Sequence, residues 1–236
     1  MIKRVFSGEE LRFLPLNGVE AQKIRSLYAA YGTGYEFCRF FCQGNSFLAA
    51  LDGDIVLHDG ENADYEELAD FLTACGFRSL FCSENAEFFL RKHIKTEFCA
   101  VNLMRFEGTP LMEKLVCYPM LEEVYFVLKT GFDIEFEPWY LDISHRIRHG
   151  ISRCYMLEGC CALAVQYNTN GEALLSQVAV LPERRGEGLG TRFVRAVCGE
   201  LAPSEVYVLC EDGLKGFYEK AGFVFCGRKF TAVCSS

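Results

Sequence analysis

The stretch PERRGEGLG, residues 182–190, is the strongest indication of the fold of this chain. It follows an apolar run, ALLSQVAVL (173–181), and precedes TRFVRAVCGEL (191–201), which has helical spacing. Three glycines in five residues would weaken a helix or a strand by roughly 0.5–1 kcal/mol each, so this turn needs bare backbone. We expect a strand, a tight turn and a helix whose first N–H groups point into the turn, an arrangement that binds phosphate or diphosphate.

The segments around this turn alternate between strand and helix patterns. The sequence predicts, in order, a strand at 96–106, helices at 119–131 and 137–150, three antiparallel strands within 152–182, a helix at 189–201, a strand at 205–210, a helix at 213–221 and a strand-rich end. This order predicts an α/β fold, a mixed sheet flanked by helices on both faces.

The first half of the chain has a shorter version of the same order. It predicts a helix at 17–32, strands within 35–60, a helix at 64–76, a short strand at 78–83 and a helix at 84–93. We therefore expect two domains, 1–95 and 96–236. The shared order is explained either by a duplication or by independent origin of a common α/β arrangement.

Composition limits the class of protein. Half of the 236 residues are hydrophobic, and the formal net charge of −8 argues against broad electrostatic binding to nucleic acid or anionic membranes. The 13 cysteines include no CxxC pair, so we expect no metal site and predict mainly buried, reduced thiols. The N-terminus lacks the apolar core of a signal peptide, and no apolar run is long enough for a membrane span, so we expect a cytoplasmic protein.

Two familiar phosphate-binding motifs do not fit the glycine turn. A P-loop requires a lysine after its last glycine, but Gly190 is followed by Thr191 and Arg192. A dinucleotide fingerprint requires G-x-G-x-x-G directly after a strand, whereas here the glycines run G-x-G-x-G and LPERR intervenes. Glu211 lies about 20 residues downstream, as that fingerprint would require, but only one strand–helix–strand unit surrounds it.

A third motif fits the turn. VAVLPERRGEGLG (178–190) resembles the V-x-x-x-x-[RQ]-x-x-G-x-[GA] signature of the GNAT superfamily of N-acetyltransferases, with Arg185, Gly188 and Gly190 at its fixed positions. GFYEKAGF (216–223) resembles the second signature of that family. The resemblance covers about 96–234 and implies a catalytic GNAT domain there, preceded by a degenerate GNAT-like half, in a tandem architecture.

The resemblance also implies a site for acetyl-CoA as co-substrate, between the strands at 173–181 and 205–210. The residues expected to bind it through backbone groups are Val178, Ala179 and Val180 for the pantetheine arm, and Arg185, Gly186, Glu187, Gly188, Leu189 and Gly190 for the diphosphate. Tyr218 stands where the family places a tyrosine beside the thioester sulfur. Asp212 stands where the family often has an asparagine that contacts the cofactor.

The reaction implied by the resemblance is direct attack of an amine on the thioester, with Tyr218 as acid and no metal. Glu211 is the candidate base and His145 a second one. The two helices before the three antiparallel strands usually border the acceptor in this family. Trp139, Tyr140, Asp142 and His145 are therefore either acceptor-site residues or ordinary core and surface residues.

The acceptor is expected to be a small-molecule or peptide amine. The first half has no glycine turn at the matching place, and four acidic residues lie within 59–66, so we expect it to bind no acyl-CoA. Two other readings of the chain stay open: a non-catalytic acyl-CoA sensor or interaction module, and a nucleotide-binding oxidoreductase that would use NAD.

Overall fold

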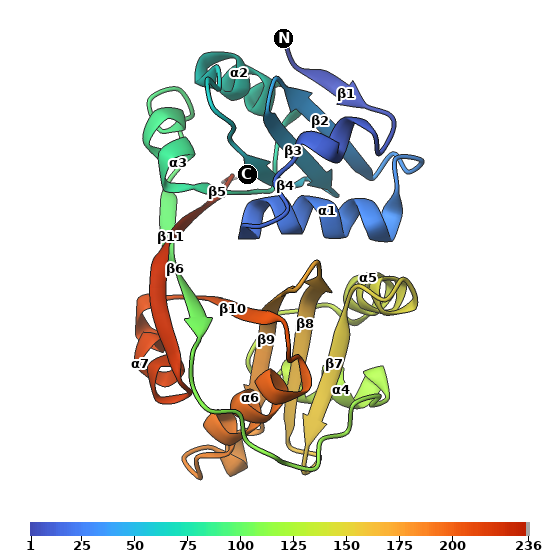
Figure 1. Ribbon diagram of the computed structural model, residues 1–236, viewed down its shortest axis with the longest axis vertical. Helices are drawn as coiled ribbons and strands as arrows, with labels where there is room; N and C mark the ends of the chain where they lie inside the picture. The colour runs from blue at the N-terminus through green and yellow to red at the C-terminus, as the bar shows by residue number, and fades with distance from the viewer. Residues whose placement is uncertain (235–236) are drawn as a thin grey trace. The chain divides into compact units, whose positions relative to one another are not determined.

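The computed structural model describes residues 1–234, which form two compact units (Figure 1). The N-terminal unit comprises residues 1–101 together with the end of the chain from Arg228, and the C-terminal unit comprises residues 102–227. Both boundaries fall inside long strands, β6 (Phe98–Phe106) and β11 (Phe223–Val233). The units differ from the expected division at 95/96 because the last part of β11 pairs with a strand of the N-terminal unit.

The C-terminal unit is a mixed sheet with helices on both faces, and its strands run in the order β6-β10-β9-β8-β7. Its remaining elements are α4 (Leu121–Leu128), α5 (Phe136–Arg148), β7 (Arg153–Leu157), β8 (Cys161–Thr169), β9 (Glu172–Val180), a 3-10 turn (Pro182–Arg184), α6 (Leu189–Glu200), β10 (Glu205–Cys210) and α7 (Asp212–Lys220). The predicted fold class and element order are confirmed.

Local sequence explains the connections of this sheet. Strands β8 and β9 are antiparallel and meet at Asn170 (φ 53°) and Gly171 (φ 77°), which adopt the left-handed backbone that a two-residue hairpin requires. Strands β9 and β10 are parallel, so a crossover must join them, and α6 is that crossover. This strand–turn–helix–strand unit holds the glycine turn at the end of β9.

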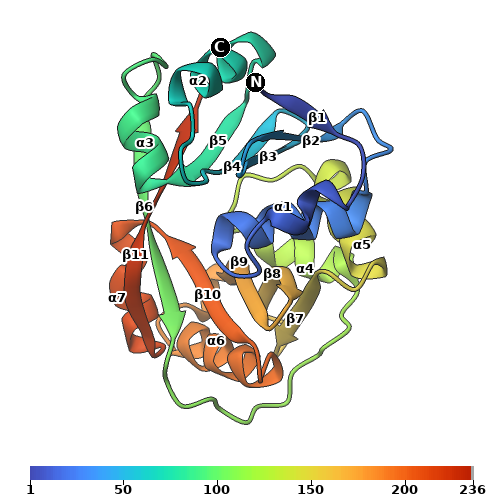
Figure 2. The same cartoon turned by 45° about the horizontal axis from the view of Figure 1, so that its top comes forward.

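Each face of the sheet carries its own core. On one face, Phe193, Val194 and Val197 of α6 are fully buried against side chains of β8, β9 and β10. On the other face, Val124 and Leu128 of α4 pack with alanines of β8 and β9. Figure 2 shows α6 and α4 on opposite faces of the sheet. The sheet is therefore held between two buried helices, and the candidate site lies at this sheet.

The N-terminal unit repeats this plan. Its elements are β1 (Lys3–Val5), a 3-10 turn (Glu10–Phe13), α1 (Val19–Tyr31), β2 (Cys38–Gln43), β3 (Ser46–Leu51), β4 (Asp54–His58), α2 (Tyr65–Cys75), β5 (Ser79–Ser83) and α3 (Glu84–Leu90). Its strands run in the order β1-β2-β3-β4-β5-β11. Three antiparallel strands, a helix, a parallel strand and a second helix follow one another in both units, which is a tandem architecture.

A hydrogen-bonded carboxylate closes the turn after β4. Asp59 accepts hydrogen bonds from Ser83 Oγ at 2.5 Å, Tyr65 Oη at 2.8 Å and Asn85 Nδ2 at 2.9 Å. Burial by itself raises the pKa of Asp59, but these three donors together outweigh it and hold the pKa below its ordinary value. The network ties the turn after β4 to the start of α3.

Removing this charge is expected to destabilise the protein in a pH-dependent way. Because the pKa of Asp59 is lower in the folded chain, its stabilisation is present above the unfolded pKa of about 3.9 and is lost as pH falls through the folded value. We expect Asp59→Asn to lower the free energy of unfolding by about 1 kcal/mol at pH 7, with the difference shrinking below about pH 5. Urea titrations at pH 7 and pH 4 measure this, with the exposed Asp70→Asn as control. A difference that did not change with pH would contradict the assignment.

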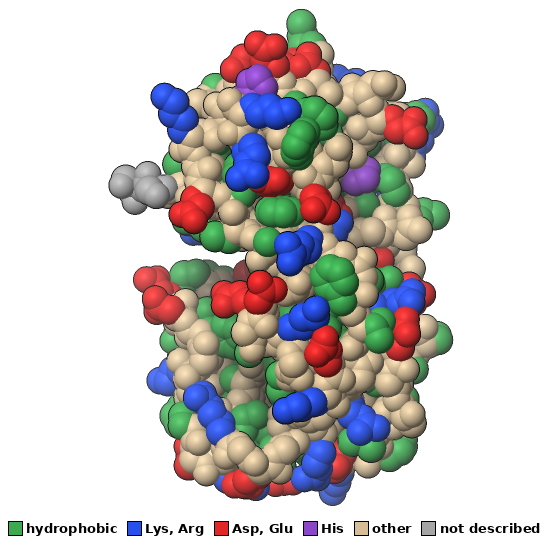
Figure 3. All heavy atoms as spheres, turned by 90° about the vertical axis from the view of Figure 1, so that its left-hand side faces the viewer, with side chains coloured by type: hydrophobic (Ala, Val, Ile, Leu, Met, Phe, Trp, Pro, Cys, Tyr) green, Lys and Arg blue, Asp and Glu red, His purple; other side chains and the backbone are tan. Residues whose placement is uncertain are grey.

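The surface carries charges of both signs. Figure 3 shows acidic and basic side chains interspersed on the surface that it displays, so the net charge of −8 is not gathered into one patch there. Eight of the 13 cysteines are buried and all are free thiols. In the described part of the chain, no helix has the length and apolar character needed to cross a membrane.

Candidate active site

Two parallel strands of the C-terminal unit separate halfway along their length. Strands β9 and β10 pair from Glu172 and Glu205 as far as Leu175 and Val208, and the pairing ends there. On its other edge β9 stays paired with β8, but the register skips Ser176 on β9 and Gln166 on β8, which is a β-bulge or a similar irregularity. Beyond Leu175, residues 176–180 of β9 have one backbone edge without a strand partner among the described residues. Val178, Ala179 and Val180, predicted to contact the pantetheine arm, lie in this stretch.

The bulge also sets which face each side chain of β9 meets. Leu175 and Val178 pack toward α6, whereas Gln177 and Ala179 lie on the opposite face with α4 and α5. Regular alternation from Leu175 through Ser176 would place Gln177 on the α6 face, so the irregularity at Ser176 turns it to the other face. The opening between β9 and β10 therefore has the α6–α7 core on one side and the α5 side chains on the other.

The three glycines of the turn have two different roles. Gly186 (φ 85°) and Gly188 (φ 76°) adopt left-handed backbone, and a Cβ atom at either position would meet nothing within 4 Å. At Gly190 a Cβ atom would lie 3.1 Å from the ring of Phe217 and 3.5 Å from Val180 Cγ2. The first two glycines thus shape an open turn, and the third lets the start of α6 pack against α7 and the end of β9.

The turn presents backbone donors without an acceptor among the described residues. Within residues 1–234, the N–H groups from Gly186 to Gly190 donate to no acceptor, and Gly188 caps α6 without a side-chain hydrogen bond. The N–H of Arg185 is used, because it donates to the Pro182 carbonyl at 3.3 Å. Five consecutive N–H groups at the positive end of a helix dipole are an arrangement able to bind an anion.

The arginines beside the turn are held by protein groups. Arg185 donates through Nε to the carbonyl of Val180 at 2.9 Å and through Nη2 to the carbonyl of Thr130 at 3.3 Å, which anchors the turn to the ends of β9 and α4. Arg184 is paired with Glu187 at 3.0 Å and with Glu158 at 3.2 Å. The positive charge of Arg184 thus lies beside the Glu187 carboxylate, so Glu187 repels an anion in the turn less than an unpaired carboxylate would.

Tyr218 lies in the core between α6, α7 and the sheet. Its side chain is 5% exposed, and its ring meets Phe217 and Phe223 edge-on at 5.0 and 5.5 Å between centroids. Its hydroxyl makes no hydrogen bond with any residue in 1–234. Burial, with smaller contributions from the Cys210 and Cys198 thiols, raises the pKa of Tyr218, so the hydroxyl keeps its proton at neutral pH.

The end of β10 holds the two acidic residues predicted there. Glu211 is the N-cap residue of α7, and its side chain is exposed and makes no capping bond. Asp212 accepts a hydrogen bond from the buried Asn102 Nδ2 at 2.7 Å. Asn102 lies on β6 opposite Cys210 and was not predicted, because its role depends on strand pairing across about 110 residues of sequence.

The residues predicted to border the acceptor are divided between the two sides of α5. Trp139 and Asp142 line a small cavity that also contains Ser176 and Gln177. Tyr140 lines a separate cavity of about 400 Å³ between α5 and β7. His145 stacks on His149 at 4.2 Å between ring centroids and lines neither cavity.

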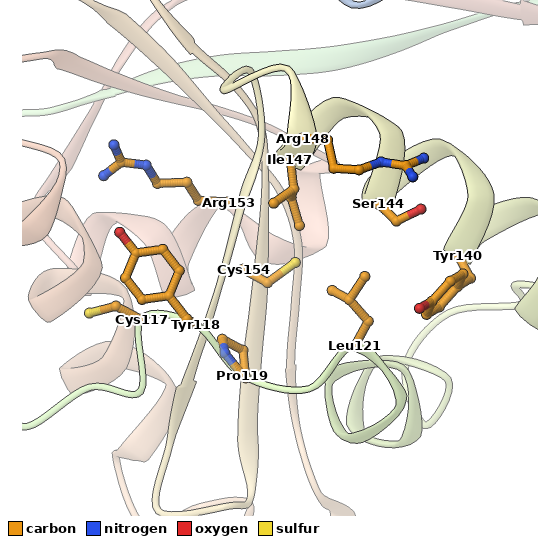
Figure 4. Close-up of a pocket in the computed structure, with 10 residues that line it drawn as sticks. All are labelled: Cys117, Tyr118, Pro119, Leu121, Tyr140, Ser144, Ile147, Arg148, Arg153 and Cys154. Carbon is orange, nitrogen blue, oxygen red and sulfur yellow. The ribbon is translucent and has the colours of Figure 1, made fainter.

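The larger cavity lies on the side of α5 away from β9. Leu121, Ile147 and Cys154 form its apolar centre, and the side chains of Arg148 and Arg153 extend in opposite directions (Figure 4). Because Cys154 belongs to β7, which only reaches β9 through β8, this cavity is two strands away from the opening between β9 and β10. The smaller cavity, in contrast, is lined by Ser176 and Gln177 of β9 itself.

The comparison with protein families decides the assignment. Residues 150–225, from the start of β7 to the start of β11, match the family described as "Acetyltransferase (GNAT) domain". This part of the chain is a GNAT domain. The match contains the glycine turn, the separating strands and Tyr218. No curated protein matches the chain.

Solved GNAT structures share the fold over the whole length of the chain. An acetyltransferase from Colwellia psychrerythraea is 15% identical, with a TM-score of 0.58 and full coverage of both chains. A GNAT protein from Kribbella flavida is 13% identical, with a TM-score of 0.64 and coverage of 92% of this chain and 94% of that one. A tandem GNAT protein from the clavulanic acid biosynthesis pathway is 12% identical, with a TM-score of 0.61 and coverage of 100% and 99%. At these identities the likeness concerns the fold, including the tandem arrangement of two GNAT-like units.

Proposed function

We propose that the C-terminal unit transfers an acetyl group from acetyl-CoA to an amine, by direct attack in a ternary complex. The observation that carries the proposal is the row of five unused N–H groups at the glycine turn, placed where β9 and β10 separate. An anion-binding helix start alone would accept many ligands. Beside a strand edge with open backbone groups, it fits a long molecule with a diphosphate and a chain of amides.

The residues present fit acetyl-CoA, which would supply the acetyl group as an activated thioester. The N–H groups of Gly186 to Gly190 would bind the diphosphate, with Arg185 adding positive charge and fixing the turn. The open edge of Val178, Ala179 and Val180 would pair with the pantetheine amides. A free N–H near Val180 is the candidate to stabilise negative charge on the carbonyl oxygen.

Tyr218 would act on the leaving group. As the new C–N bond forms and the C–S bond breaks, the electron pair goes to sulfur, and the amine must lose a proton. Thiols have a pKa near 8.5, below that of a buried tyrosine, so Tyr218 would stabilise the thiolate mainly by donating a hydrogen bond. Glu211, exposed at the end of β10, is the candidate base. A Glu211→Gln variant with wild-type rates from pH 6 to pH 9 would remove Glu211 from the mechanism.

We also propose that the N-terminal unit binds no acyl-CoA. Its strands β4 and β5 separate after Val56 and Phe81, as β9 and β10 do. The turn that follows contains Asp59 instead of the glycine loop, and its hydrogen bonds to Ser83 and Asn85 join the two sides of the opening. A fixed negative charge at this place repels a diphosphate.

Thermal-shift titration tests the proposal first. Saturating acetyl-CoA is expected to raise the melting temperature, because a ligand that binds only the folded state stabilises it, whereas NAD is expected to leave it unchanged. Release of CoA thiol in the presence of an amine panel then separates an enzyme from an acyl-CoA sensor. Stabilisation by acetyl-CoA without transfer to any amine would favour the sensor, and stabilisation by NAD alone would refute both.

A further inference from the structure

The small cavity beside the bulge has a lining that is partly apolar and carries several polar side chains. It measures about 180 Å³, and the residues that define its chemistry are Trp139, Asp142, Arg146, Ser152, Ser176 and Gln177. This volume corresponds to about six water molecules, so the cavity can hold a small polar group but not a segment of another protein. Because Ser176 and Gln177 are the first residues of β9 beyond its pairing with β10, the cavity adjoins the opening between the strands.

The orientation of the Gln177 amide follows from its partner. Trp139 Nε1 lies 3.0 Å from Gln177 Oε1. An indole N–H only donates, so the bonded atom of the amide must be its oxygen. The two N–H groups of Gln177 Nε2 therefore point away from the indole, and no residue in 1–234 accepts from them. Gln177 presents a fixed hydrogen-bond donor at the cavity.

A fixed ion pair forms another wall. Arg146 Nε contacts both carboxylate oxygens of Asp142, at 2.8 and 2.9 Å, one turn apart on α5. The Arg146 side chain is 6% exposed and that of Asp142 is 40% exposed. The carboxylate is thus the more accessible charge, while the buried guanidinium keeps the cavity from being net negative. Asp142 can attract a cationic group in the cavity, and Arg146 can attract an anionic one. Because Arg146 is buried, water weakens its electrostatic attraction less than it would that of an exposed side chain.

We propose that the acceptor is a small amine that carries a carboxylate, of the amino-acid type. Its ammonium group pairs with the Asp142 carboxylate, and its own carboxylate accepts a hydrogen bond from Gln177 Nε2. The positive charge of Arg146 favours a charged carboxylate over a neutral carbonyl at this place. The inference rests on the proposed function. In the reaction the bound ammonium first gives one proton to a base. The nitrogen then forms the bond to the acetyl carbon while the C–S bond breaks with its electron pair on sulfur, and the second proton of the nitrogen goes to that sulfur. The products are an N-acetyl amino acid and free CoA thiol.

The variant Gln177→Glu tests the donor directly. Glutamate keeps an oxygen for the Trp139 N–H but replaces the two amide donors with a second oxygen and a negative charge. We expect wild-type kcat/KM for alanine to exceed that for ethylamine at least tenfold, with alaninamide between them. The variant is expected to lower this ratio at least tenfold, mainly through a higher KM for alanine.

A second variant and a binding measurement keep the test decisive. Trp139→Phe keeps an aromatic ring, although a smaller one, and removes the N–H that orients Gln177, so the preference for alanine is expected to fall partway. Melting temperature with acetyl-CoA shows whether each variant is folded and binds its co-substrate. If wild-type protein acetylated amines without favouring the carboxylated ones, or if Gln177→Glu left the ratio unchanged, this inference would be wrong and the proposed function would stand. If acetyl-CoA bound but no amine were acetylated, both would fail.

Discussion

The variant Gly188→Asp is expected to raise the Kd for acetyl-CoA at least about 100-fold. Gly188 has φ 76° and open space where a side chain would begin, at the first turn of α6. Aspartate there would place a carboxylate against the row of N–H groups, where it would both occupy the anion site and repel a diphosphate. Titration calorimetry with acetyl-CoA and with free CoA measures the loss.

Two matched variants separate the charge from backbone strain. Gly171→Asp puts the same residue at φ 77° in the β8–β9 turn, also in open space, so it has the same strain but lies away from the glycine turn. It is expected to bind acetyl-CoA as the wild type does. Gly188→Ala adds a side chain without charge, and an intermediate loss of about tenfold is expected. Wild-type affinity in Gly188→Asp would show that the turn does not hold the diphosphate.

Local signals in the sequence were sufficient for nearly all of the fold. Glycine and asparagine marked the turns at Asn170-Gly171 and at Asp52-Gly53, and each predicted helix and strand occurs within a few residues of its expected bounds. Strand β1 (Lys3–Val5) was missed because three residues show no periodicity. The pairing of β11 with β5 was missed as well, since register between strands about 150 residues apart leaves no local trace.

The candidate site was predicted only as far as its backbone motif extends. The glycine turn and Tyr218 each lie within a contiguous sequence signature, so both could be located without knowledge of the fold. The side chains opposite them depend on long-range contacts: Asn102 meets Asp212, and Trp139 meets Gln177. One local signal was available for the second pair, because the adjacent polar residues Ser176 and Gln177 break the alternation expected of a regular, apolar strand.

Tyr218→Phe is expected to lower kcat for acetyl transfer at least tenfold while leaving the affinity for acetyl-CoA unchanged. The substitution removes only the hydroxyl, and a phenylalanine ring keeps the edge contacts with Phe217 and Phe223. Because the hydroxyl has no partner in residues 1–234, its removal leaves no buried group unsatisfied, so stability is expected to stay the same or rise slightly. Rates of thiol release and calorimetry separate the two effects.

The pH dependence sharpens this test. Burial raises the pKa of Tyr218, so its hydroxyl stays protonated from pH 7 to pH 9.5 and the loss in Tyr218→Phe is expected to be the same throughout that range. Tyr207→Phe is the matched control, because it removes a hydroxyl that bonds to Glu205 on the paired part of β10. It is expected to keep full activity. If Tyr218→Phe also kept full activity, the departing sulfur would not depend on this hydroxyl, and stabilisation of the leaving group would have to come from solvent or from backbone groups of the separated strands.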